Sequence, residues 1–429
     1  MVTQNPNGVS QLVEHLFRHE SAKLVATLTR IFGIEHWNLA EDVVQEALAR
    51  ALETWPYRGV PENPSAWIMR ASRNLALDVI RREKVFRGKE PEIARLIEDS
   101  SSASLEAEIL LENELGDDRL RMMFVCCHPV IAPEAQVALA LKTLCGFSVT
   151  EISRAFLTTE AAIAKRLTRA KQKIQEARVP FEIPVGDELT RRVDSVLQSL
   201  YLLFNEGYKA SGGSKLVREE LCHEAIRLTE LLAQHRSGNR PKTHALLALM
   251  LLNAARNPAR EDDEGNLLRL EEQDRKKWDQ MMIVHGVSCL TKSAADGEIS
   301  EYHLQAGIAA CHATASDYQF TDWARILSLY DRLMEFDDSP VIALNRAVAI
   351  ANFHGPQAGL EAVRAIRDHE KLASYYLFYS VIGELEVRMN NREAAAEQFR
   401  KAFELAETKS ERAFLLKRLQ HCVNGAITN

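Results

Sequence analysis

The chain has 429 residues, of which 46% are hydrophobic and 26% are charged. These are ordinary values for globular proteins, and they exclude a wholly disordered chain. The formal net charge of −7 excludes neither nucleic acid nor protein as a partner, because basic and acidic segments cancel in such a sum.

Neither the start of the chain nor its apolar runs predict a membrane protein. The first residues lack a basic start followed by an apolar core, so we expect no signal peptide. The longest apolar run, 245–255, is too short to span a bilayer and is typical of a buried helix. Seven cysteines without regular spacing predict reduced thiols rather than a disulfide framework. We therefore expect a cytoplasmic protein that does not bind a membrane.

Apolar residues recur with the helical period almost everywhere, and alternating strand patterns are nearly absent, so the chain is predicted to be all-α. Charge divides it further, because the basic tract 67–89 is followed by an acidic, serine-containing tract at 88–118. We expect five parts: a helical module at 1–88, an acidic flexible linker at 89–116, a second helical module at 117–182, a helical extension at 183–290 and helical repeats at 291–429. Fully extended, the linker would span roughly 90 Å.

The first module contains one predicted helix at 40–56 and another at 64–84, where Pro64 suits the first turn. The first helix has an apolar stripe and an opposite polar face; the stripe is Ala40, Val43, Val44, Ala47, Leu48, Ala51 and Leu52, and the polar face carries Asp42, Gln45, Glu46 and Glu53. Between the helices we predict a loop at 55–64, rich in proline, glycine and aromatic residues. A basic helix beside such a loop suits phosphates and unpaired bases, and an ordinary surface helix fits the same pattern.

The second module carries a helix-turn-helix pattern at 147–178. Ser148 and Glu151 form a predicted capping box at the first helix, and Thr159 is placed to cap the second. The second helix has an apolar stripe and a basic free face; the stripe is Ile163, Leu167, Ala170 and Ile174, and the free face carries Lys165, Arg166, Arg169 and Lys173. This arrangement is typical of a helix that reads the major groove, and an amphipathic hairpin with solvated lysines is the alternative. The turn has Leu157 where glycine is frequent, which predicts a different turn type.

The stretch MMFVCCHP at 122–129 holds two adjacent cysteines and a histidine, a combination found in metal sites and thiol nucleophiles. The positions i, i+3, i+4 and i+7 of its helical stripe are Leu120, Met123, Phe124 and Cys127. Cys126 lies about 100° further round the helix, which makes joint ligation by the two thiolates awkward. We expect both cysteines to pack as small hydrophobes, with a redox-sensitive Cys126 as the alternative.

Residues 339–408 contain a weak internal repeat with an offset of about 36 residues, near the tetratricopeptide period. Small and large residues in its clearer copy are spaced so that two helices can pack closely: Tyr379, Ile382, Gly383, Ala395, Phe399 and Ala402. We predict turns at 354–356 and 390–391. Because such repeats offer a concave surface, a protein or peptide partner is a hypothesis for this region.

Two stretches of the sequence resemble regions two and four of bacterial sigma factors, and most closely those of the extracytoplasmic-function group. The stretches are AEDVVQEALARALETWP…NPSAWIMRASRNLALDVIRREK and GFSVTEISRAFLTTEAAIAKRLTRAKQKI. The remainder is similar to the subgroup with a long, tetratricopeptide-like helical extension. That likeness lies in SLYLLFNEGYKAS, RPKTHALLALMLLNAARNPAR, LEEQDRKKWDQ and TDWARILSLYDRL.

The resemblance implies that the chain binds core RNA polymerase, through its clamp and flap, and promoter DNA. The residues that would dock on the clamp are Asp42, Gln45 and Glu46. Asn74 stands where the family contacts a flipped base of the −10 element, and the residues that would support the melted strand are Trp67, Arg70, Arg81 and Arg82. The residues that would read the −35 element are Thr159, Ala162, Lys165, Arg166 and Arg169.

The resemblance also implies that catalysis belongs to the polymerase, so we expect a non-enzyme without cofactor or metal. The acidic linker would thread polymerase channels as a phosphate mimic, and the C-terminal region would tune activity. One alternative is a helix-turn-helix regulator with a repeat domain that binds DNA without polymerase. Another is a metal-dependent or thiol enzyme centred on Cys126, Cys127 and His128, although the common catalytic motifs are missing from the sequence.

Overall fold

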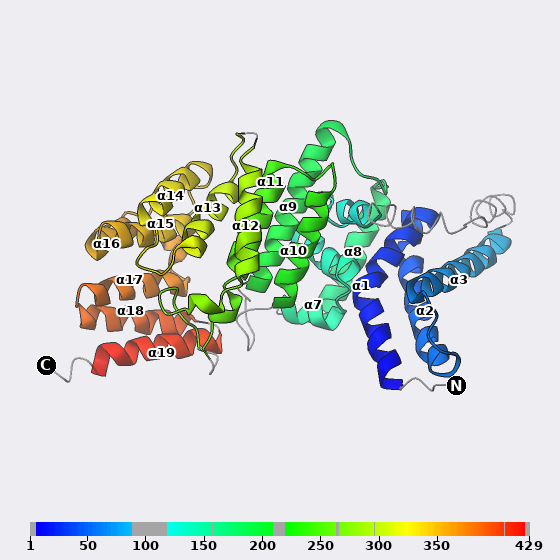
Figure 1. Ribbon diagram of the computed structural model, residues 1–429, viewed down its shortest axis with the longest axis horizontal. Helices are drawn as coiled ribbons and strands as arrows, with labels where there is room; N and C mark the ends of the chain where they lie inside the picture. Colours follow the sequence, from blue (N-terminus) through cyan, green and yellow to red (C-terminus); the bar gives the residue numbers. More distant parts are fainter. Residues whose placement is uncertain are drawn as a thin grey trace. The chain divides into compact units, whose positions relative to one another are not determined.

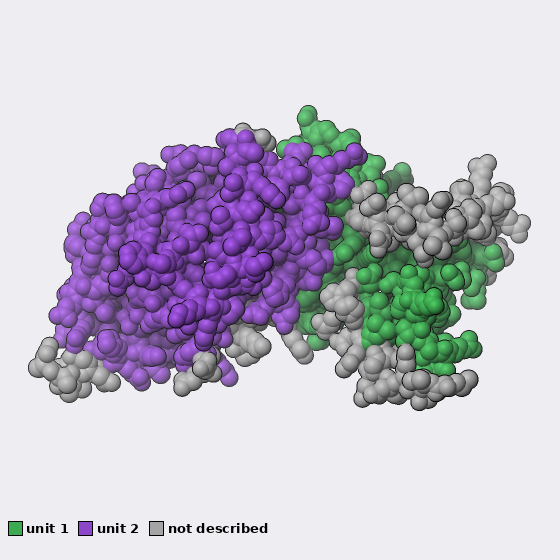
Figure 2. All heavy atoms as spheres, in the orientation of Figure 1, with its two compact units in different colours: residues 1–200 green, residues 201–429 purple. Residues whose placement is uncertain are grey.

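The computed structural model describes residues 6–87, 118–156, 158–208, 219–262, 266–295, 297–406 and 408–424. Within these ranges every regular element is a helix, which confirms the predicted all-α fold; an isolated bridge joins Glu261 and Leu267. The chain forms two compact units, residues 1–200 and 201–429 (Figure 2). The predicted acidic linker and the predicted turn residue Leu157 lie outside the described residues.

Unit 1 begins with three helices, α1 (Pro6–Phe32), α2 (Trp37–Arg58) and α3 (Pro64–Arg87), with the 3-10 turn η1 (Ile34–His36) between the first two (Figure 1). Helix α2 packs against both α1 and α3. The largest fully buried side chains of this core are Leu28, Trp37, Trp55 and Ile68. The predicted stripe of α2 is buried except for Leu52, which is 43% exposed. Each step of four residues from Val44 rotates the side chain about 40° around the helix, so Leu52 reaches the edge of the core.

The second half of unit 1 is a smaller helical cluster. Residues 118–126 are helical and are followed by α6 (Pro133–Leu139), the π-helical turn η2 (Ala140–Leu144), α7 (Val149–Ala155) and α8 (Glu160–Glu176). The first part of α9 (Gly186–Tyr208) closes the cluster. Arg192 Nη2 donates to the Phe124 carbonyl at 2.6 Å, Ser195 Oγ to the Cys127 carbonyl at 2.7 Å, and Ser199 Oγ to Gln136 Oε1 at 2.7 Å. Helix α9 therefore completes unit 1 before it continues into unit 2.

Unit 2 begins with helices packed around α11. They are α10 (Glu219–Gln234), α11 (Pro241–Ala254), α12 (Gln280–Ser293) and α13 (Glu301–Thr314), with short 3-10 turns η3 (Asn257–Ala259) and η4 (Arg275–Lys277). Helix α11 packs against α10, α12 and α13, and ten of its residues are buried. The run 245–255 is thus a core helix, as predicted. No helix among the described residues is long and apolar enough to cross a membrane.

The rest of unit 2 is a series of helical hairpins, coloured yellow to red in Figure 1. They comprise α14 (Trp323–Phe336), α15 (Pro340–Phe353), α16 (Pro356–Arg364), the 3-10 turn η5 (His369–Leu372), α17 (Tyr376–Arg388), α18 (Arg392–Leu405) and α19 (Lys409–Asn424). The predicted turns are confirmed, with Gly355 at φ +98° and Asn390 at φ +64°. A Cβ added at Gly383 would lie 2.9 Å from a ring carbon of Phe399. The small residue therefore lets α17 and α18 approach closely.

Candidate nucleic-acid and polymerase interface

Three polar side chains share the exposed side of α2. Asp42, Gln45 and Glu46 are exposed, because the buried stripe on the other side of the helix sets its rotation. Arg50 Nε donates to Glu46 Oε1 at 3.0 Å one turn further on. The side chains predicted to bind polymerase thus form one accessible, mainly acidic surface.

Helix α3 presents a basic, exposed face. Arg70, Asn74 and Arg81 are spaced at i, i+4 and i+11 and are all exposed, and Arg82 is exposed beside them. Asn63 begins the helix by accepting a hydrogen bond from the Ala66 backbone N–H at 3.0 Å. Four of the five side chains predicted to contact the −10 strand therefore project from one capped helix.

The two tryptophans near α3 have different roles. Trp67 is partly buried and meets Trp55 edge to face, with 5.5 Å between ring centroids. Trp55 is 1% exposed and belongs to α2, so the predicted loop at 55–64 is wrong at its start. Helix α2 runs through Pro56 to Arg58; Pro56 has no N–H to donate to the Leu52 carbonyl, and the Gly59 N–H donates to the Trp55 carbonyl at 3.0 Å, where the helix ends. The exposed aromatic of this segment is Tyr57, at 90%.

The caps predicted at the starts of α7 and α8 are confirmed. Ser148 N–H donates to Glu151 Oε2 at 2.7 Å, and Glu151 N–H donates to Ser148 Oγ at 3.1 Å. Thr159 Oγ1 accepts from Ala162 N–H at 3.2 Å at the start of α8. These reciprocal bonds satisfy backbone donors that have no partner inside the helix. They fix where each helix starts.

The apolar stripe of α8 is buried as predicted. The opposite face of the helix lines a groove of about 700 Å³. Thr159, Ala162, Lys165 and Arg169 are exposed, and Arg166 is half-buried with its guanidinium 5.8 Å from the centroid of the Phe156 ring. The groove is lined on its other side by Ile131, Ala132 and Ala135. The predicted −35 residues thus share one accessible, positively charged surface.

Comparison with known proteins matches two parts of the chain to families. Residues 16–85 match sigma-70 region 2, and residues 192–294 match a family of unknown function, DUF6596. The chain is also 38% identical, over 385 residues, to an uncharacterized protein of Rhizobium meliloti (strain 1021), with 90% of each chain covered. The region 2 match spans the acidic face of α2 and most of α3 with its basic face, whereas α8 lies outside both family matches.

The chain belongs to the sigma-70 family. Its region two and its long helical C-terminal region make it similar in organisation to extracytoplasmic-function sigma factors. Sigma factors serve in promoter recognition and transcription initiation, and they do so together with core RNA polymerase and promoter DNA.

Within unit 1 of this sigma factor, α8 packs against the start of α2. Lys171 Nζ lies 2.7 Å from Glu41 Oε2 and 3.1 Å from Asn38 Oδ1, and 5.1 Å from the ring centroid of the buried Trp37. Only 11% of the Lys171 side chain and 17% of the Glu41 side chain are exposed. A lysine of α8, the helix predicted to read DNA, is thus held by the helix that carries the acidic face.

A second charged contact joins the same two helical clusters. Arg30 Nε on α1 donates to Asp118 Oδ2 at 2.9 Å, and Asp118, which is fully buried, also accepts from Arg121 at 2.5 Å. Sequence reasoning missed both contacts. A hint was present for Lys171, which follows Leu167 by four residues and precedes Ile174 by three, so it lies on the buried stripe of α8.

The adjacent cysteines are buried side chains. Cys126 and Cys127 are both fully buried, as predicted for packing residues. Burial raises the pKa of Cys127 to about 12 and that of Cys126 well above its usual value, so both thiols stay protonated at neutral pH. Burial lowers the pKa of His128 to about 4, and its Nδ1 accepts from the Val130 N–H at 3.0 Å. Among the described residues no group of three His, Cys, Asp or Glu side chains is placed to hold a metal ion.

Proposed function

We propose that this sigma factor docks on the clamp of core RNA polymerase through Asp42, Gln45 and Glu46. It reads the melted non-template strand of the −10 element with Trp67, Arg70, Asn74, Arg81 and Arg82. It reads the −35 duplex in the major groove with Thr159, Ala162, Lys165, Arg166 and Arg169, while this module rests on the polymerase flap. The chain itself carries no catalytic step.

The observation that carries the proposal is the separation of charge on two folded cores. The exposed side of α2 is mainly acidic, whereas α3 and α8 expose arginine and lysine over their accessible faces. A basic face neutralises phosphates, and a helix that is capped and buried along one stripe places its free side chains at base edges. The acidic face suits a protein partner, since like charge would repel DNA.

Promoter binding requires unit 1 to open. The −10 and −35 elements lie about 25 base pairs apart, which is roughly 85 Å along the duplex. In the structure Lys171 of α8 touches Glu41 of α2, so the two clusters cannot reach both elements at once. We propose that docking on polymerase breaks this contact and that the acidic linker, 89–116, spans the gap inside polymerase channels.

We further propose the division into region two (1–88), linker (89–116), region four (117–182), helical extension (183–290) and tetratricopeptide-like repeats (291–429). The hairpins α15–α16 and α17–α18, with their close approach at Gly383, support the repeat assignment. The C-terminal region tunes sigma activity, and its concave side is the place for a partner.

The test is promoter-specific transcription by purified chain and core polymerase. We expect transcripts from a −10/−35 promoter that depend on the added chain, and poor DNA binding by the chain alone. Protection of a double-stranded site without polymerase, together with no binding to polymerase, would instead favour a helix-turn-helix regulator.

A further inference from the structure

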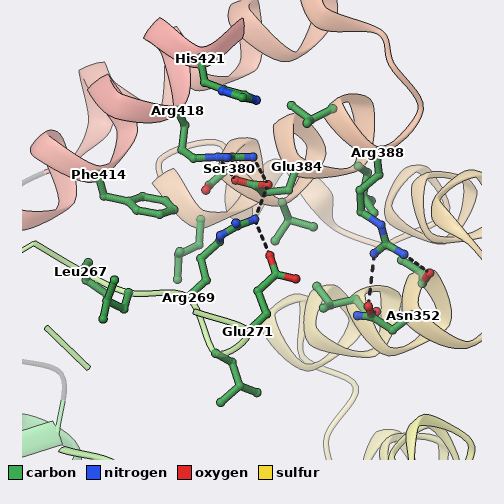
Figure 3. A pocket seen from close by; sticks show the side chains of 18 of the residues that line it. Leu267, Arg269, Glu271, Asn352, Ser380, Glu384, Arg388, Phe414, Arg418 and His421 are labelled. Carbon is green, nitrogen blue, oxygen red and sulfur yellow. Dashed lines mark hydrogen bonds and ion pairs between the residues drawn. The ribbon is translucent and has the colours of Figure 1, made fainter. Parts of the chain in front are cut away.

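A cavity of about 720 Å³ lies within the C-terminal repeats (Figure 3). Its walls are α15, α17 and α19, together with residues 267–271 of the connection between α11 and α12. The lining side chains of successive repeats occupy equivalent positions, since Asn352 and Arg388 are 36 residues apart and Glu384 and Arg418 are 34 apart. Each repeat thus presents its first helix to the same cavity.

One side of the cavity is neutralised by ion pairs. Arg418 binds Glu384 with two hydrogen bonds of 2.6 Å, and Arg269 Nη1 reaches the same carboxylate at 3.2 Å. Arg269 also pairs with Glu271 at 2.6 Å. These contacts hold the segment 267–271 against α17, as Figure 3 shows. Both arginines on this side are therefore already neutralised by glutamates and carry no unpaired positive charge for a ligand.

The other side carries Arg388, whose guanidinium contacts neutral groups. It donates to the Ala351 carbonyl at 2.9 Å and to Asn352 Oδ1 at 3.3 Å, and Asn352 Oδ1 also accepts from the Tyr318 hydroxyl at 3.2 Å. Among the described residues no carboxylate forms an ion pair with Arg388. Since a guanidinium has five N–H donors, the side chain retains donors for a bound anion.

The rest of the lining selects the kind of anion. Three arginines and three glutamates line the cavity, so its formal charge is balanced; they are Arg269, Arg388, Arg418, Glu271, Glu384 and Glu411. A second negative charge on the ligand would lie near the three glutamate carboxylates and would be repelled by them. A single negative charge can instead bind to Arg388. Apolar side chains complete the walls, chiefly Leu267, Leu270, Val348, Leu377, Val381 and Phe414.

We infer that this cavity binds a small amphipathic monocarboxylate, with its carboxylate on Arg388 and its apolar body against the leucine, valine and phenylalanine side chains. The volume lies within the range of small-molecule sites in proteins. The ligand also contacts the segment 267–271, so occupancy stabilises the attachment of this segment to α17. The C-terminal region is in this way a receptor for a small acid.

The experiment measures binding of decanoate to the full-length chain by titration calorimetry, with decanamide as the uncharged probe of equal length. We expect decanoate to bind at least tenfold more tightly than decanamide, because a charge-assisted hydrogen bond to Arg388 is lost in the amide. Arg388→Gln abolishes this preference. Arg346→Gln is the control and keeps the preference for decanoate. Arg346 of α15 pairs with Asp331 of α14 at 2.6 Å and does not line the cavity.

A second variant separates the cavity from the charge. Leu377 lines the cavity and does not belong to the buried cores of the repeats, so Leu377→Trp fills the space and weakens both probes at an unchanged melting temperature. The proposal is overturned if neither probe binds at 1 mM, roughly the weak limit of specific binding, or if acid and amide bind equally. Binding only of a peptide with a free C-terminus would likewise overturn it. Because the readout is binding, failure leaves promoter recognition untouched.

Discussion

Lys171 and Glu41 stand 130 residues apart in the chain, yet Lys171 Nζ lies 2.7 Å from Glu41 Oε2. The pair joins the helix proposed to read the −35 element to the helix proposed to bind polymerase. Glu41 is the immediate neighbour of Asp42, so under the proposed function the polymerase clamp would compete with the ion pair for the same stretch of α2. We therefore propose that this ion pair holds the free sigma factor closed beside the surface proposed to bind polymerase.

Substitution of Lys171 by methionine should favour the open form. Loss of this largely buried pair removes about 1–2 kcal/mol from the closed state, between the values for exposed and fully buried pairs. The open population then rises roughly 5- to 30-fold. We expect tighter binding to core polymerase, measured by fluorescence anisotropy of the labelled chain. Glu176→Gln, on the exposed side of the same helix, is the control, and equal affinities for both variants would contradict the closed state.

Substitution of Arg169 or Lys165 by alanine should weaken binding to the −35 element in the polymerase complex. Each removes one positive charge from the groove along α8, so the slope of log affinity against log salt falls by about 1 if the side chain contacts phosphate. If it contacts a base, the loss is about 1–3 kcal/mol and selectivity relaxes at one position. Thr168→Ala, an exposed position of α8 that does not line the groove, should change neither quantity. Unchanged binding in both arginine and lysine variants would exclude α8 as the reading helix.

Substitution of Asn74 by alanine should impair promoter melting and leave polymerase binding intact. Loss of hydrogen bonds to an unpaired base costs about 1–3 kcal/mol. Permanganate reactivity of thymines around the −10 element measures this, with Asp78→Ala as an exposed control on α3. Normal melting by the Asn74 variant would remove this residue from the −10 contact.

The burial of Cys126 and Cys127 leads to one prediction about stability and one about reactivity. Because the pKa of Cys127 is about 12 in the folded chain and near 9.0 when unfolded, the folded state keeps its proton where the unfolded state loses it. The free energy of unfolding should therefore be unaffected by this group below pH 9 and should fall between pH 9 and 12.

At pH 8 a thiol reagent should modify Cys311, which is partly exposed, before Cys126 and Cys127. Rapid modification of Cys126 in the folded chain would restore the redox alternative.

Removal of the C-terminal region should change the level of transcription and leave the preferred promoter sequence unchanged, because unit 1 holds the proposed DNA-reading residues. The cut belongs after Tyr208, which keeps Arg192, Ser195 and Ser199 of α9. A cut after residue 185 should also lower the stability of unit 1 by about 1–3 kcal/mol, since the carbonyl of Phe124 loses its buried donor. Full transcription by the chain cut after Tyr208 would exclude a regulatory role for the rest.

Local features were predictable from sequence because they depend on residues a few positions apart. The capping box at Ser148 and Glu151 and the stripe from Ile163 to Ile174 are of this kind. Features that depend on tertiary packing could not be predicted from the sequence. Trp55 reads as a loop aromatic because prolines and glycine follow it, yet the core retains it in α2.

The candidate sites follow the same division. The exposed residues of α2, α3 and α8 follow from helical periodicity together with family motifs, whereas Lys171 looks like one more basic residue until its distant partner Glu41 is known. Arg388 is equally inconspicuous in sequence. Its place beside Asn352 arises only when the repeats stack.

The central claim is that this chain directs core RNA polymerase to promoters. The most direct measurement is in vitro transcription with purified core polymerase, the full-length chain and a library of promoter fragments. We expect start sites that appear only with the chain, share −10 and −35 sequences, and disappear when Asn74 and Arg169 are both replaced by alanine. Absence of any polymerase binding, or transcription that does not depend on the added chain, would contradict the account.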